Sequence, residues 1–124
     1  MASVRYIVEN IEEALPFYER LGFEVSMHPG HGFAMLQRED LQLLLNTPGG
    51  GGGAGQAMPD GALPRPGGWN RIQIQVDNLS ATVNRLSDAG VTFRSEIIEG
   101  TGGNQVLADD PSGNPIELFQ AVGR

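Results

Sequence analysis

The chain has 124 residues, enough for one hydrophobic core, and its eight arginines stand against fifteen Asp and Glu to give a net charge of −7. This acidic balance argues against nucleic-acid binding, and the absence of cysteine excludes disulfides, thiolate metal sites and cysteine nucleophiles. No apolar run approaches the length of a membrane span, and the N-terminus has no basic start followed by an apolar core, so we expect a cytoplasmic protein that does not contact a membrane.

The first third of the chain predicts a strand, a helix and three further strands. Apolar and polar residues alternate from Ser3 to Val8, as in a half-buried strand. Asn10, with Glu13 three residues later, is a favourable N-cap for the following helix, whereas Pro16 is expected to kink that helix or delay its start. The later strands are predicted at Phe23–Met27, Gly32–Gln37 and Leu41–Leu45.

A glycine-rich segment, Thr47–Gly68, then interrupts the pattern. Glycine makes up 18 of the 124 residues, about twice its usual share, and seven of these lie from Gly49 to Gly61. The segment also holds four prolines and shows no apolar periodicity, so it predicts a long loop. A loop of this length inside a small protein is typical of a lid or a connector.

The second half repeats the first at an offset of 68 residues. Val76-Asp77-Asn78-Leu79 matches Val8-Glu9-Asn10-Ile11, and both sets stand between a predicted strand and a predicted helix. The second helix is predicted at Leu79–Ala89, and its strands at Arg71–Val76, Thr92–Ile98, Gln105–Ala108 and Pro115–Gln120. The chain therefore reads as two βαβββ modules, residues 1–46 and 69–124, joined by the loop at 47–68.

Strand alternation separates a packing face from a second, more polar face in each module. Ile72 and Ile74 are expected to pack against a helix, which leaves Arg71, Gln73 and Gln75 on the other face. The same reasoning places Arg5, Gln42, Leu44, Glu117 and Phe119 on the second face of their strands. This face is either simply solvated or lines a small-molecule cleft. The mixture of opposite charges, amides and apolar side chains favours a cleft.

Three segments resemble the vicinal oxygen chelate superfamily, which includes glyoxalase I, extradiol dioxygenases and bleomycin-resistance proteins. They are Ala14-Leu15-Pro16-Phe17-Tyr18, Leu21-Gly22-Phe23-Glu24-Val25, and the closing stretch from Asp110 to Phe119. The resemblance implies a single α+β domain of two tandem βαβββ modules, which form a cupped mixed sheet with the helices on its outer face. It also implies a homodimer.

In metal-dependent members of that superfamily, each module supplies two ligands, one from its first strand and one from its last. By position, these sites fall on Ser3 and Gln42 in one module and on Arg71 and Glu117 in the other. Only Glu117 is a competent ligand, because serine and glutamine bind divalent metals poorly and arginine stays protonated. We therefore predict no metal at this position, and an ion pair between Arg71 and Glu117 in its place.

Two other features have competing interpretations. His28 and His31 form an H-x-x-H pattern around Pro29 and Gly30, which we interpret as exposed histidines of a loop between strands and not as a metal site. Trp69, the only tryptophan, either anchors the end of the long loop or stacks on a planar ligand, and both roles are compatible.

These observations predict a metal-independent protein that binds or sequesters a small organic metabolite or antibiotic, with no cofactor and with the glycine-rich loop as an adaptable lid. The alternative is a glyoxalase-like lyase, isomerase or dioxygenase that uses a divalent metal or Glu117 as acid or base. A third interpretation is a structural or regulatory subunit with an empty cleft. The predicted ligand-binding residues are Arg5, Phe33, Gln42, Leu44, Trp69, Arg71, Gln73, Gln75 and Phe119.

Overall fold

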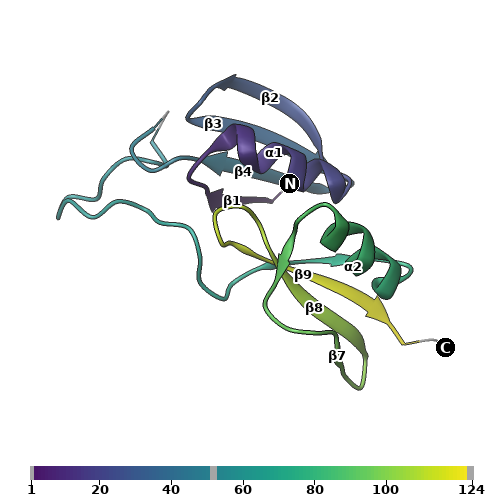
Figure 1. Ribbon diagram of the computed structural model, residues 1–124. Helices are drawn as coiled ribbons and strands as arrows, with labels where there is room; N and C mark the ends of the chain where they lie inside the picture. The colour runs from purple at the N-terminus through teal and green to yellow at the C-terminus, as the bar shows by residue number, and fades with distance from the viewer. Residues whose placement is uncertain (1, 51–52, 123–124) are drawn as a thin grey trace. The chain divides into compact units, whose positions relative to one another are not determined.

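The computed structural model describes residues 2–50 and 53–122, and the chain divides into two compact units, residues 1–67 and 68–124. Unit 1 contains β1 (Ser3–Ile7), α1 (Ile11–Arg20), β2 (Glu24–Gly30), β3 (Phe33–Arg38) and β4 (Leu41–Asn46) (Figure 1). Unit 2 contains β5 (Ile72–Gln75), α2 (Leu79–Asp88), β6 (Thr92–Phe93), β7 (Ile98–Glu99), β8 (Gly103–Asp109) and β9 (Pro115–Ala121). The predicted pair of βαβββ-like modules is confirmed, and each unit forms its own mixed sheet.

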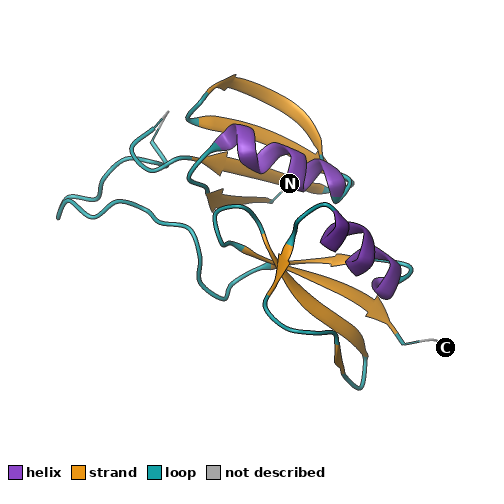
Figure 2. Ribbon diagram, in the orientation of Figure 1, coloured by secondary structure: helices purple, strands orange, loops and turns teal. Residues whose placement is uncertain are grey.

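The sheet of unit 1 has the order β1-β4-β3-β2, with β1 parallel to β4 and the other pairs antiparallel. α1 covers one face of this sheet (Figure 2), where alternate residues of β4 such as Leu43 and Leu45 are fully buried. The opposite face carries the intervening residues, so that Arg5 lies beside Leu44 and Asn46 lies between Ile7 and Phe33. This face is the one that alternation predicted to be polar.

The sheet of unit 2 has the order β5-β9-β8-β6, with β7 paired to β8 outside that path. β5 runs parallel to β9, and the buried side chains of Ile74, Ile116 and Leu118 form the face that packs with α2. The opposite face presents Gln73 next to Glu117 and Gln75 next to Phe119.

Both helices begin where their caps predict. The Asn10 side chain accepts a hydrogen bond from the backbone N–H of Glu13 at 2.9 Å, and Asn78 accepts one from Ala81 at 3.0 Å. α1 starts directly after its cap and continues through Pro16, so the proline does not delay the helix. None of the helices among the described residues is both long and apolar enough to cross a membrane.

Two of the strand assignments made from sequence are wrong. The strand predicted at 92–98 is two short strands, because the register against β8 changes between them. Phe93 lies opposite Ala108 and Ile98 opposite Gln105, so the segment 93–98 contains two more residues than the stretch of β8 that it faces. β2 also extends to Gly30, so His28 lies in a strand and not in a loop. Between β4 and β5, the described residues form no helix or strand, as the composition predicted.

Candidate functional site

A buried carboxylate lies at the centre of the polar face of unit 2. Glu117, on β9, is only 8% exposed, and β5 places Gln73 directly beside it. Arg71, one residue before β5, approaches Glu117 Oε1 with Nε at 3.0 Å and Nη2 at 2.9 Å. Gln73 Nε2 donates to the other oxygen, Oε2, at 2.7 Å. The expected ion pair between Arg71 and Glu117 is therefore present, and both carboxylate oxygens accept hydrogen bonds.

Arg71, Gln73 and Glu117 form a hydrogen-bonded cluster, and the other residues predicted in unit 2 lie at different distances from it. Gln75 and Phe119 occupy the next row of the same sheet face, between β5 and β9. Trp69 contacts the cluster through its backbone, because its carbonyl oxygen accepts a hydrogen bond from Arg71 Nη1 at 3.3 Å. Trp69 as a whole remains 69% exposed.

Arg94 holds the Trp69 side chain, and sequence reasoning missed it. Its guanidinium carbon lies 4.6 Å from the centre of the indole ring, in cation–π contact. Arg94 also donates to the Asp109 carboxylate at 2.7 Å and to the backbone oxygens of Gly68 and Gly113 at 3.0 and 3.1 Å. These contacts hold Trp69 and Gly68 at the end of the long loop. An isolated arginine after a short strand gives no sequence signal for such a role.

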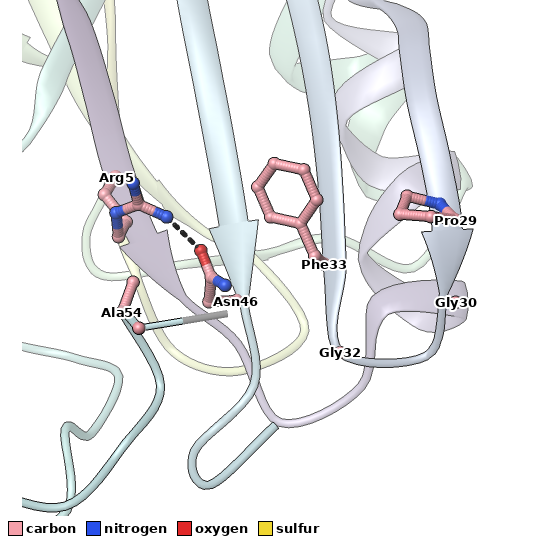
Figure 3. Close-up of a pocket in the computed structure, with 8 residues that line it drawn as sticks. Arg5, Pro29, Gly30, Gly32, Phe33, Asn46 and Ala54 are labelled. Atoms are coloured by element: carbon pink, nitrogen blue, oxygen red, sulfur yellow. Dashed lines mark hydrogen bonds between the residues drawn. The ribbon is translucent and has the colours of Figure 1, made fainter. Parts of the chain in front are cut away.

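Unit 1 contains a separate pocket of about 490 Å³ at one end of its sheet (Figure 3). Arg5 from β1 and Phe33 from β3, both among the predicted ligand contacts, line it, and Asn46 from β4 lies between them. An Arg5 Nη1 hydrogen bond to Asn46 Oδ1 links the two polar side chains. The remaining lining residues are Pro29, Gly30, Gly32, Gly53 and Ala54.

Gln42 and Leu44 are not among the residues that line this pocket, although they share its sheet face. The Gln42 side chain accepts a hydrogen bond from Ser3 Oγ at 2.6 Å and donates one to the sulfur of Met35 at 3.1 Å. Sequence reasoning missed Asn46 because it treated β4 as ending at Leu45. The structure carries the strand one residue further, which places Asn46 on the pocket face.

The four positions that correspond to metal ligands in the resembled superfamily do not suit a divalent ion. Ser3 and Gln42 are weak donors and bond to each other, whereas in unit 2 the Glu117 carboxylate is already paired with a permanent cation, Arg71. Across residues 2–50 and 53–122, no group of three or more His, Asp or Glu side chains has a geometry that could hold a metal ion.

His28 and His31 share one carboxylate. Glu12 Oε2, in the first turn of α1, lies 3.0 Å from His28 Nε2 and 2.9 Å from His31 Nδ1. The hydrogen bond from His31 is the main reason why the pKa of Glu12 lies below its usual value, and His28 contributes in the same direction. The contacts connect α1 to β2 and to the turn after it, at the exposed surface.

Comparison with known proteins assigns the fold to a superfamily. Residues 1–118 match the family model described as Glyoxalase/Bleomycin resistance protein/Dioxygenase superfamily. A superfamily member of known structure from Sphaerobacter thermophilus is 26% identical, with a TM-score of 0.73, and the match covers 97% of this chain and 95% of that one. No curated protein gives a significant match.

Two further solved structures are similar in fold. TnmS3, an antibiotic binding protein from Streptomyces, is 25% identical with a TM-score of 0.71, and the match covers 97% of this chain and 93% of that one. A lactoylglutathione lyase from Agrobacterium tumefaciens is 17% identical with a TM-score of 0.72, over 97% of this chain and 92% of that one. From the family match over residues 1–118 and the paired modules, we conclude that the chain belongs to the glyoxalase/bleomycin resistance protein/dioxygenase superfamily.

Proposed function

We propose that this member of the superfamily is a metal-independent protein that binds a small organic molecule. The observation that carries the proposal is the state of Glu117, the one competent metal donor among the four corresponding positions. Its carboxylate is neutralised by Arg71 and hydrogen-bonded by Gln73, so a divalent ion would have to displace a guanidinium that carries a permanent charge.

The chemistry of the second sheet faces supports binding. Arg5, Phe33, Gln42 and Leu44 in unit 1, and Trp69, Arg71, Gln73, Gln75 and Phe119 in unit 2, combine a few polar groups with apolar and aromatic side chains. This is the usual composition of a small-molecule site. The similarity to a protein named for antibiotic binding points to the same class of activity. We propose these nine residues as ligand contacts of their respective units.

An enzyme of glyoxalase type is the alternative, with Glu117 as acid or base. The similarity in fold to a lactoylglutathione lyase keeps this alternative open. Three contacts already reach the Glu117 carboxylate, two from Arg71 on Oε1 and one from Gln73 on Oε2, so a substrate proton would have to arrive at the remaining acceptor site of Oε2. Because two partners already engage this carboxylate, we favour binding without catalysis.

Elemental analysis and a thermal-shift screen test the proposal together. After dialysis, we expect the purified protein to retain no stoichiometric Ni, Fe, Mn or Zn, and a metal content of about one ion per chain would overturn the metal-independent assignment. The screen uses bleomycin and a library of planar natural products. A ligand present at 100 times its dissociation constant raises the free energy of unfolding by about 2.7 kcal/mol.

The expected homodimer is checked in the same preparation by sedimentation velocity. If no organic molecule in the library stabilises the chain and a metal ion does, the binding proposal fails and the enzyme alternative takes its place.

A further inference from the structure

In the pocket of unit 1, none of the described carboxylates pairs with the positive charge of Arg5. Within residues 2–50 and 53–122, Arg38, Arg71 and Arg94 each form an ion pair with an acidic side chain. Arg5 forms none there, and its side chain bonds to the neutral amide of Asn46. In a chain with fifteen acidic residues, an arginine left in this state is available to an anion from outside the protein.

Asn46 holds this guanidinium at the wall of the pocket. Asn46 is 2% exposed and lies on β4, so its side chain is fixed by the sheet. It engages one Nη1 proton of Arg5 through Oδ1 and leaves the remaining guanidinium donors for a ligand. Arginine presents its donors as a planar fork, which matches the two oxygens of a carboxylate.

The rest of the pocket is apolar or small. Phe33 lies across Asn46 from Arg5, with its ring beside the same space (Figure 3). Pro29 and Ala54 add apolar contact, and among the described residues that line the pocket Arg5 is the only charged one. A volume of about 490 Å³ lies within the range typical of small-molecule sites, about 300–1,000 Å³. One cation, one amide and a flat apolar wall suit a ligand with an anionic end and a flat apolar body.

The glycine-rich segment forms part of this pocket because it folds back on itself. Gly49 N–H donates to the carbonyl of Gly55, and Gly50 N–H donates to that of Thr47 at 3.1 Å. A Cβ at Gly55 would overlap the Thr47 carbonyl oxygen, so only glycine permits this return. The return of the chain at Gly55 places Ala54 at the pocket.

We propose that the unit 1 pocket binds aromatic carboxylates, with the Arg5 guanidinium pairing with the carboxylate and the Phe33 ring contacting the aromatic body. This inference rests on the proposed small-molecule binding and adds the class of ligand and its place. It assigns anion recognition to Arg5 and not to Arg71, because Arg71 is already neutralised by Glu117.

The test compares two probes with the same aromatic body, 2-naphthoate, which carries an anionic carboxylate, and 2-naphthamide, which carries a neutral amide. Both are small, so we expect a dissociation constant of about 1 mM for naphthoate, and binding is followed by ¹H–¹⁵N NMR titration of the full chain. We expect naphthoate to bind at least tenfold more tightly than naphthamide. The amide signals of Gly30 and Gly32 and the side-chain NH₂ of Asn46 should shift along one saturation curve.

Variants locate the charge that is responsible. Arg5→Gln should weaken naphthoate binding at least tenfold and leave naphthamide within about twofold, whereas Arg5→Lys should retain part of the preference. Arg65→Gln is the matched control, since it removes the same charge from an exposed position of the loop. Retained NMR dispersion shows that each variant is folded. If Arg5→Gln does not fold, Arg5→Lys supplies the test.

Equal binding of the two probes, or an equal loss with Arg65→Gln, overturns the proposal. If neither naphthyl probe binds while another organic molecule from the screen does, the carboxylate assignment is wrong and the general binding function stands. If no organic molecule binds and the protein holds a metal ion, the proposed function itself fails.

Discussion

Replacement of Arg71 by methionine tests whether the ion pair with Glu117 organises unit 2. Methionine keeps much of the aliphatic stem and removes the guanidinium, so the Glu117 carboxylate would retain only its hydrogen bond from Gln73. The Glu117 side chain is 11% exposed and that of Arg71 is 28% exposed, so water can solvate the remaining charge only in part. Loss of one partner of a fully buried pair costs about 3–5 kcal/mol, and partial exposure reduces the expected cost to about 2 kcal/mol.

A double-mutant cycle separates the pair from other effects of the substitution. Arg71→Met, Glu117→Gln and the double variant should give a coupling energy of about 1–2 kcal/mol. The matched control is the pair Arg38–Glu39, whose carboxylate side chain is 80% exposed, and its cycle should give less than about 0.5 kcal/mol.

The assay is urea unfolding at pH 7, followed by the fluorescence of Trp69 and by far-UV circular dichroism. Trp69 is the only tryptophan and lies in unit 2, two residues from Arg71, so its signal reports on the unit that carries the substitution. The reasoning is refuted if Arg71→Met lowers the free energy of unfolding by less than about 0.5 kcal/mol, or if the two cycles give the same coupling energy.

Two further predictions concern unit 1. The pKa of Glu12 in the folded chain is lowered mainly by the hydrogen bond from His31. The ionised carboxylate therefore stabilises the fold at pH values above 4.5, its pKa in the unfolded chain, and this contribution is lost as the pH falls through the lower pKa of the folded chain. Calorimetry should therefore show a lower Tm for Glu12→Gln than for the unsubstituted chain at about pH 5.5, and a smaller difference at about pH 3.5; a constant difference would contradict this. Gly55→Ala should destabilise the fold by about 1–3 kcal/mol, because the new Cβ meets the Thr47 carbonyl, and should weaken ligand binding to the pocket. Gly102→Ala, where a Cβ meets nothing within 4 Å, should change the Tm little, and equal effects of the two substitutions would rule out the close approach as the cause.

Local signals in the sequence predicted the elements that depend on local chemistry. Asn10 and Asn78 marked both helix starts, because the side chain of a cap bonds to a backbone group only three residues away. Alternation in β5 predicted which side chains lie on each face, since successive residues of a strand point in opposite directions. The same reasoning brought Arg71 and Glu117 together, because it placed both on the second face of the strands of the second module.

Other features depend on partners that are distant in the chain. The break between β6 and β7 follows from the register against β8, and the role of Arg94 follows from Gly68, Asp109 and Gly113, none of which a local pattern connects to it. β4 continues to Asn46 because Ile7 and Phe33 pair with that residue on either side.

The amino-acid sequence shows by its patterns that this acidic, cysteine-free chain repeats a βαβββ module, and through its resemblance to the superfamily it implies one competent metal donor among the four corresponding positions. It also marked the glycine-rich segment as a loop, because its composition cannot sustain a helix or strand. The folded arrangement was needed to show that Arg71 is neutralised by Glu117 and that Arg5 lies in a pocket beside a neutral amide, because the balance of a charge depends on the groups within a few ångströms of it.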